Sequence, residues 1–156
     1  MKSTGNKQLL IIGIGNSGRR DDGLGWALLD ELKERLSIPA TYEYRYQLQI
    51  EDASIIGDYE HVVFVDATED QWEKGFYWSE LQAKPATSYT SHALKPERVL
   101  FLCQQLYQEY PACYTLAITG QEWGLQLGLS ETAKSNLKKA RTAITKYLDL
   151  LVQQPA

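Results

Sequence analysis

Hydrophobic runs and alternating patterns divide this chain into segments that read as strands and helices in turn. Residues 8–15 form a continuous hydrophobic run ending in glycine, which is typical of a strand buried on both faces of a parallel sheet. Residues 41–49 alternate tyrosine or leucine with polar side chains, and this period of two predicts a second strand. Three further strands are expected, at residues 61–65, 75–81 and 113–119.

Helical periodicity fills the intervals between these strands. Hydrophobic residues at three- and four-residue spacings predict helices over residues 22–36, 50–57, 96–109 and 131–152. Asp21 and Ser130 are placed to cap the first and last of them, because short polar side chains accept hydrogen bonds from a helix N-terminus. Five side chains of the last helix should point inward: Leu137, Ala140, Ile144, Leu148 and Leu151.

The alternation of strands and helices predicts an α/β fold, a three-layer sandwich with a mostly parallel, five-stranded twisted sheet flanked by helices. The chain of 156 residues is the length of a single domain, with residues 1–7 as a flexible N-terminus. Ligands of such sheets bind outside the carboxyl ends of the strands. The informative segments are therefore the loops that follow strands, at residues 13–22, 66–70, 83–93 and 120–128.

Composition excludes several classes of protein. Sixteen basic and 20 acidic residues give a net charge of −4 and a pI near 5.2, which argues against a nucleic-acid-binding protein. No hydrophobic run approaches the ~20 residues of a transmembrane helix, and no signal peptide is expected. Cys103 and Cys113 form no CxxC pair and suit a core in a reducing cytoplasm. A monomer is expected.

The first loop contains a GxGxxG pattern, which by itself suggests a dinucleotide site. Asp21 and Asp22 argue against it, since two carboxylates at the following helix would repel a pyrophosphate. The acidic residue expected at the end of the second strand is also missing. Asp22 has two open interpretations: a solvated first-turn acid favoured by the helix dipole, or a side chain that lies over the strand ends.

Asp66 is the stronger candidate, because it follows a buried strand, where a carboxylate is costly unless it is paired or bound to a metal. His92 lies in a polar loop between another strand and a helix. His61 opens the strand that Asp66 closes, roughly 16 Å away at ~3.3 Å per residue, and is excluded as lying at the wrong end of the sheet.

Together, Asp22, Asp66 and His92 would supply two carboxylates and one imidazole, a set that suits zinc, nickel or manganese. Three protein ligands leave coordination positions open, as in sites where a metal polarises a carbonyl or activates water. No GxSxG or HExxH motif offers another nucleophile or metal site.

These residues resemble the motifs of the hydrogenase maturation endopeptidases, which trim the large subunit of nickel–iron hydrogenases. The first motif is a hydrophobic strand, GxGN, four residues, an acidic pair and GxG. The second is a hydrophobic strand ending in Asp66-Ala67, and the third is Ser91-His92 followed by Leu94. The resemblance covers residues 8–148, with one departure: Gln47, Leu48 and Gln49 stand where many members have a glycine-rich turn.

The resemblance implies that Asp22, Asp66 and His92 are both the metal ligands and the catalytic residues. It implies a cytoplasmic endopeptidase, aspartic-type or metal-dependent, that binds nickel already carried by a hydrogenase large-subunit precursor and removes a short C-terminal peptide. Other divalent ions could occupy the isolated site. Gly13, Gly15 and Asn16 would let the substrate chain approach closely.

Two alternatives stay open at this stage. A module of the same fold could sense bound metal without cutting, since both activities need the same ligands. A nucleotide-binding domain is the other alternative, and it predicts stabilisation by a dinucleotide that does not depend on Asp22.

Overall fold

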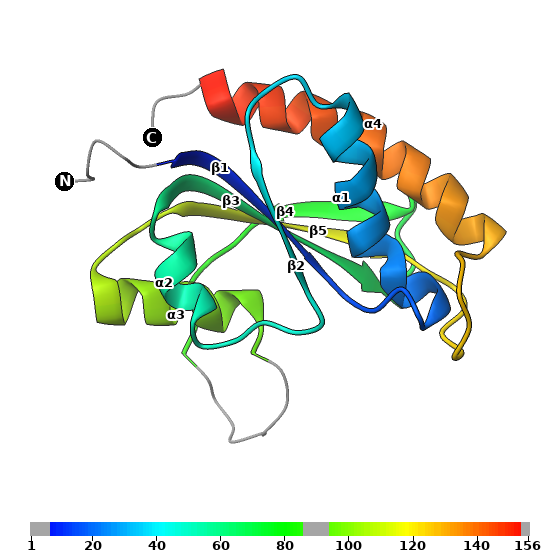
Figure 1. The fold of residues 1–156 in the computed structure, drawn as a ribbon, viewed down its shortest axis with the longest axis horizontal. Coiled ribbons are helices and arrows are strands. Elements are labelled where there is room, and N and C mark those ends of the chain that lie inside the picture. The colour runs from blue at the N-terminus through cyan, green and yellow to red at the C-terminus, as the bar shows by residue number, and fades with distance from the viewer. Residues whose placement is uncertain (1–6, 86–93, 154–156) are drawn as a thin grey trace.

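A mixed five-stranded sheet forms the middle layer of the computed structural model, which describes residues 7–85 and 94–153 (Figure 1). The strands lie in the order β2-β1-β3-β5-β4, and all neighbours are parallel except β4 and β5. Their bounds are β1 Lys7–Ile14, β2 Thr41–Arg45, β3 Tyr59–Thr68, β4 Phe76–Glu80 and β5 Ala112–Thr119.

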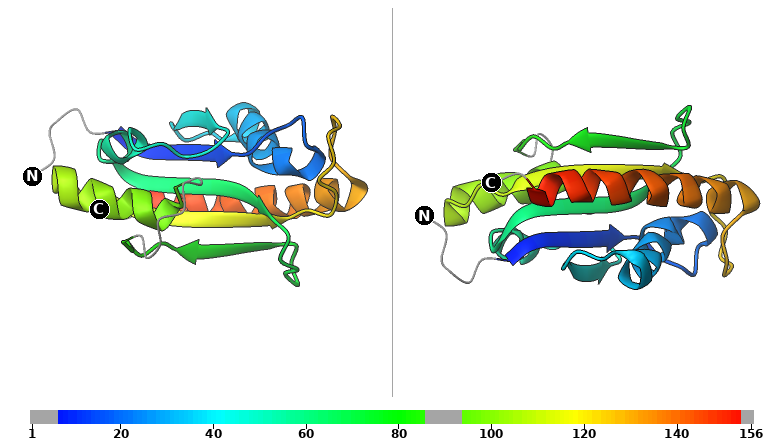
Figure 2. Two further views of the ribbon diagram at one scale, coloured as in Figure 1. Left: turned by 90° about the horizontal axis from the view of Figure 1, so that it is seen from below. Right: turned by 90° about the horizontal axis from the view of Figure 1, so that it is seen from above.

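Helices cover both faces of the sheet (Figures 1 and 2). One face packs against α1 (Leu24–Arg35) and α4 (Glu131–Gln153), and the other against α2 (Asp52–Ile56) and α3 (Pro96–Tyr107). Successive side chains of a strand point to opposite faces, so Leu9 and Ile11 enter the first core while Leu10 and Ile12 enter the second. The predicted three-layer α/β sandwich is confirmed.

The last helix follows its sequence prediction closely. Ser130 caps it, because the Ser130 hydroxyl accepts a hydrogen bond of 3.1 Å from the backbone N–H of Ala133. The five side chains predicted to point inward are all buried: Leu137, Ala140, Ile144, Leu148 and Leu151. No helix in the described part of the chain is long and apolar enough to cross a membrane.

The first helix begins later than its periodicity predicted. A 3-10 turn, η1 (Arg20–Gly23), precedes α1, so Asp21 lies within the turn and caps neither helix. The prediction of Asp21 as an N-cap was therefore wrong. Its carboxylate is instead engaged by a loop about a hundred residues further along the chain.

Strand β3 extends further than predicted, because its pairing with β5 continues to Thr68 opposite Thr119. Asp66 therefore lies inside the paired part of the strand, opposite Ala117, and not directly after it. His61 lies near the other end of β3, paired with Leu9 and Ala112, as the exclusion of this residue required.

The chain leaves β4 at the opposite edge of the sheet from the one that the sequence analysis predicted. Strand β4 is antiparallel to β5, so its carboxyl end lies at the opposite edge from those of the parallel strands. The described chain resumes at Leu94, which forms an isolated antiparallel bridge with Leu48, just past the end of β2. The direction of β4 was not readable from its short hydrophobic pattern, since the same pattern suits either orientation.

Candidate active site

The glycines of the first loop allow α1 to pack directly on the strand ends. A Cβ at Gly25 would lie 2.7 Å from the carbonyl oxygen of Val65 in β3, and one at Gly13 would lie 2.9 Å from that of Gly25. Gly15 has a φ of +146°, and a Cβ there would overlap the carbonyl oxygen of Asp22. The GxGN…GxG spacing therefore serves close internal packing, which brings Asp22 to the end of β3.

Asn16 holds the first loop in shape. Its side-chain oxygen accepts a 2.8 Å hydrogen bond from the Gly18 N–H, and its own N–H donates to the Asp22 carbonyl at 3.1 Å. Gly13 and Gly15 are buried, whereas Asn16 is half-buried. Contact between these three residues and a substrate chain stays a prediction.

Asp66 is the most perturbed carboxyl group of the site. Its pKa is raised to about 7, chiefly by burial and also by the charge of Asp22, while a hydrogen bond of 2.8 Å from the Ala67 N–H acts in the opposite direction. The interaction with the Asp22 charge indicates that the fold brings the two carboxylates, from η1 and β3, near each other. That they form one metal-binding site stays a prediction.

Asp22 is also perturbed in the same direction. Burial raises its pKa, while the Arg19 guanidinium and the Asn16 backbone lower it. Two half-buried carboxylates that repel each other form a site that favours either a proton or a cation. The donor set therefore fits a divalent metal ion, which would supply the missing positive charge.

His92 lies outside the described residues, so its place relative to the acid pair stays a prediction. Within residues 7–85 and 94–153, no cluster of three His, Cys, Asp or Glu side chains could hold a metal. Leu94, two residues beyond His92, is fixed by its bridge to Leu48. That bridge ties the chain just before α3 to the loop that follows β2.

The sequence analysis missed the structural role of Asp21, a buried carboxylate next to the candidate site. Asp21 is 0% exposed, and its Oδ2 accepts hydrogen bonds from the N–H groups of Gln121 and Glu122 at 2.7 and 2.9 Å. Ser130 donates twice more, from Oγ to Oδ2 at 2.7 Å and from N–H to Oδ1 at 2.8 Å. We call this arrangement the Asp21 clamp, because it fastens the β5–α4 loop to η1.

The Asp21 clamp keeps its carboxylate charged. Burial by itself would raise the Asp21 pKa, but the hydrogen bonds from Ser130, Gln121 and Glu122 outweigh burial and hold the pKa below its usual range. Asp21 and Asp22 are thus adjacent acids with opposite shifts. The one is a structural anion and the other belongs to the candidate site.

We expect Ser130→Ala to destabilise the protein by about 1–3 kcal/mol. The substitution removes both a hydrogen bond to the charged Asp21 and the cap of α4, and each loss is on the order of 1 kcal/mol or more. Urea denaturation at pH 7 measures the difference. Ser135→Ala, an exposed serine inside the same helix, is the matched control and should change stability by less than about 0.5 kcal/mol. Equal effects of the two substitutions would contradict the clamp.

Several solved structures share this fold over almost the whole chain. The hydrogenase maturating endopeptidase HybD from E. coli is 15% identical, with a TM-score of 0.67 and coverage of 92% of this chain and 93% of that one. The [NiFe] hydrogenase maturation protease HycI from Thermococcus kodakarensis KOD1 is 22% identical, with a TM-score of 0.66 and coverage of 97% and 96%.

A third structure, a hydrogenase 2 maturation peptidase from a Thaumarchaeota archaeon, is 21% identical, with a TM-score of 0.66 and coverage of 92% and 99%. No family model and no curated protein matches the chain by sequence. The comparisons therefore establish the fold. The resemblance noted in the sequence motifs is confirmed at this level, since the chain has the fold of the hydrogenase maturation proteases.

Proposed function

We propose that this protein is an endopeptidase that removes a short C-terminal peptide from the nickel-loaded precursor of a nickel–iron hydrogenase large subunit in the cytoplasm. The observation that carries the proposal is the interaction between the charges of two acids: Asp22, on the turn after β1, and Asp66, two residues before the end of β3. These are the positions at which the family motifs carry metal ligands.

In this proposal, Asp22 and Asp66 supply two oxygen ligands to the nickel ion of the precursor, and His92 supplies a nitrogen ligand. The nickel belongs to the substrate, and it would polarise the scissile carbonyl while holding the precursor in place. The repulsion between the two carboxylates favours recognition of a loaded precursor, because a metal-free one brings no charge to relieve it.

The raised pKa of Asp66 bears on how the metal would bind. With a pKa of about 7 in the metal-free protein, Asp66 holds a proton near neutral pH in part of the molecules, and a metal ion that binds the carboxylate would displace this proton. The hydrogen bond from Ala67 engages one carboxylate oxygen and leaves the other for the metal.

The direct test is the intact mass of a hydrogenase large-subunit precursor coexpressed with this protein, with nickel supplied or withheld. We expect loss of a single C-terminal peptide with wild-type protein and nickel, and a full-length precursor without nickel or with His92→Ala. Asp70→Asn, an exposed acid beyond β3, is the control and should process normally.

Two other outcomes would each change the proposal. Equal processing by His92→Ala would leave a peptidase with a different third ligand. A precursor that stays full length but is retained by the wild-type protein in a nickel-dependent pull-down would replace the peptidase by a metal-sensing binding module.

A further inference from the structure

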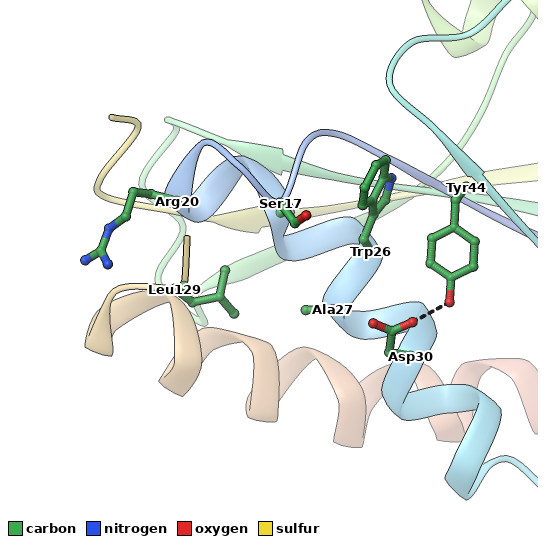
Figure 3. A pocket seen from close by; sticks show the side chains of 9 residues that line it. Ser17, Arg20, Trp26, Ala27, Asp30, Tyr44 and Leu129 are labelled. Carbon is green, nitrogen blue, oxygen red and sulfur yellow. Dashed lines mark hydrogen bonds between the residues drawn. The ribbon is translucent and has the colours of Figure 1, made fainter. Parts of the chain in front are cut away.

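A hollow of about 320 Å³ is lined in part by residues of η1 and α1 (Figure 3). Neither Asp22 nor Asp66 lines it. Its wall is formed by the first loop, one face of α1, Tyr44 of β2 and the Gly128–Leu129 turn before α4. The hollow is therefore a separate feature, although two residues that line it, Arg20 and Gly23, flank Asp22 in the chain.

The middle of the hollow is apolar and rigid. Trp26, Ala27 and Leu129 line it, and each is half-buried. The Trp26 indole N–H donates to the Arg45 carbonyl oxygen at 3.1 Å, and its ring meets that of Tyr44 edge-on at 6.0 Å. Because the indole is fixed from both sides, an apolar side chain could pack there without reordering it.

The two ends of the hollow differ in charge. At one end, the Tyr44 hydroxyl donates to Asp30 at 2.6 Å, which satisfies that carboxylate (Figure 3). At the other end lies Arg20, whose guanidinium reaches the exposed Glu122 at 3.4 Å. A long ion pair with an exposed partner is easily exchanged for a better one.

The backbone at Arg20 adds a second observation. Arg20 has a φ of +53°, the left-handed region that favours glycine, and the fold maintains it through a 2.9 Å hydrogen bond from the Arg20 N–H to the Gln126 carbonyl. Strained residues of this kind are concentrated at ligand-binding sites. An arginine in place of glycine thus points to a use for its side chain.

We propose that the hollow is a binding subsite for the partner protein, taking an apolar side chain over Trp26 and an adjacent acidic side chain at Arg20. The proposal rests on the proposed function, in which the partner is the hydrogenase precursor. Charge complementarity selects the occupant, because Arg20 is the cation among the residues that line the hollow and the lining carboxylate, Asp30, already accepts a hydrogen bond from Tyr44. Arg20 and Asp22 share the turn η1, so the subsite adjoins the turn that carries one acid of the pair.

The subsite can be tested without any peptidase activity, with two amidated peptides, N-acetyl-Gly-Asp-Leu-Gly-amide and its Asn counterpart. The readout is the NMR signal of the Trp26 indole N–H, assigned with Trp26→Phe. We expect the signal to shift as peptide is added and to reach a plateau. The Asp peptide should bind at least fivefold more tightly than the Asn peptide. Absence of a shift, or equal affinities, would overturn the subsite.

Two variants at the ends of the Arg20–Glu122 ion pair separate binding from structure. Arg20→Gln should abolish the preference for the Asp peptide, and Arg20→Lys should retain part of it. Glu122→Gln should strengthen Asp-peptide binding about twofold, because it frees the guanidinium. If the ion pair only stabilised the fold, Arg20→Gln and Glu122→Gln would change the affinity for the Asp peptide in the same direction. That outcome would reject the proposal.

Kinetics of precursor processing provide a second test of the subsite. We expect Arg20→Gln to raise KM for processing at least fivefold with little change in kcat, since the residue binds and does not react. If wild-type protein processes the precursor and Arg20→Gln leaves KM unchanged, the subsite fails while the peptidase stands. If wild-type protein processes nothing, the proposed function fails, and the peptide titration still decides the subsite.

Discussion

Asp66→Asn is expected to stop precursor processing and, in the metal-free protein, to make the fold more stable. Asparagine keeps the oxygen that accepts the Ala67 hydrogen bond but removes the charge. Loss of a metal ligand should lower the processing rate at least ~100-fold, because the charge stabilisation that a correctly held metal supplies is worth several kcal/mol of the barrier.

The stability gain follows from the direction of the pKa shift. The Asp66 pKa rises from 3.8 to about 7 on folding, so the native state binds the proton more tightly than the unfolded chain does. The free energy of unfolding therefore falls as pH rises through the window from about 4 to 7, and the full penalty is present above it. Removing the charge should raise the free energy of unfolding by on the order of 2–4 kcal/mol at pH 8 and by little at pH 4.

Urea denaturation of metal-free wild type and Asp66→Asn at pH 4 and pH 8 measures this gain, and precursor mass measures processing. Asp70→Asn is the matched control, the same change at an exposed acid four residues away, and it should alter neither quantity. A loss of stability at pH 8 would show that the Asp66 charge is a structural requirement, and its assignment to the active site would be wrong.

The features that sequence predicted correctly depend on local patterns. The hydrophobic run of β1 and the leucine spacing of α1 specify element type and buried face, because each side chain's direction follows from the period of its element. Asp66 could be placed near a carboxyl end because a buried strand leads directly into it. The same rule, that parallel neighbours end at the same edge of the sheet, is the basis for grouping Asp22 with it, and their joint role as a site stays a prediction.

The features that sequence missed depend on distant contacts. Asp21 looks like an ordinary helix cap, and nothing near it indicates that donors from residues 121, 122 and 130 surround its carboxylate. The left-handed backbone at Arg20 has no sequence signal either, because it is imposed by pairing with Gln126. A conspicuous acid pair followed much later by a glycine-rich loop was the available clue, but no spacing rule connects them.

Asp21→Asn is expected to be the most destabilising single change at this edge of the sheet, at about 3–5 kcal/mol. The buried carboxylate accepts four hydrogen bonds, and an amide nitrogen would face a donor in either orientation. The cost of leaving donors unpaired around a lost buried charge is of this size. Amide exchange at Gln121 and Glu122 should accelerate as well, because the clamp holds both N–H groups.

The pH dependence of the clamp is opposite to that of Asp66. Because the folded pKa of Asp21 is below the unfolded value of 3.8, its contribution is fully present above that value. It is lost as pH falls through the lower, folded pKa. The difference between wild type and Asp21→Asn should therefore be constant from pH 5 to pH 8 and shrink only in acid.

Asp22→Asn is the sharpest control, since it is the same substitution at the next residue. Burial raises the Asp22 pKa, so removing its charge should leave stability unchanged or slightly higher while it impairs nickel-dependent processing. The two adjacent acids thus have different expected roles: Asp21 holds the loop after β5 against η1, and Asp22 is the proposed metal ligand. Equal destabilisation by both substitutions in urea would contradict this division, because it would make both acids structural.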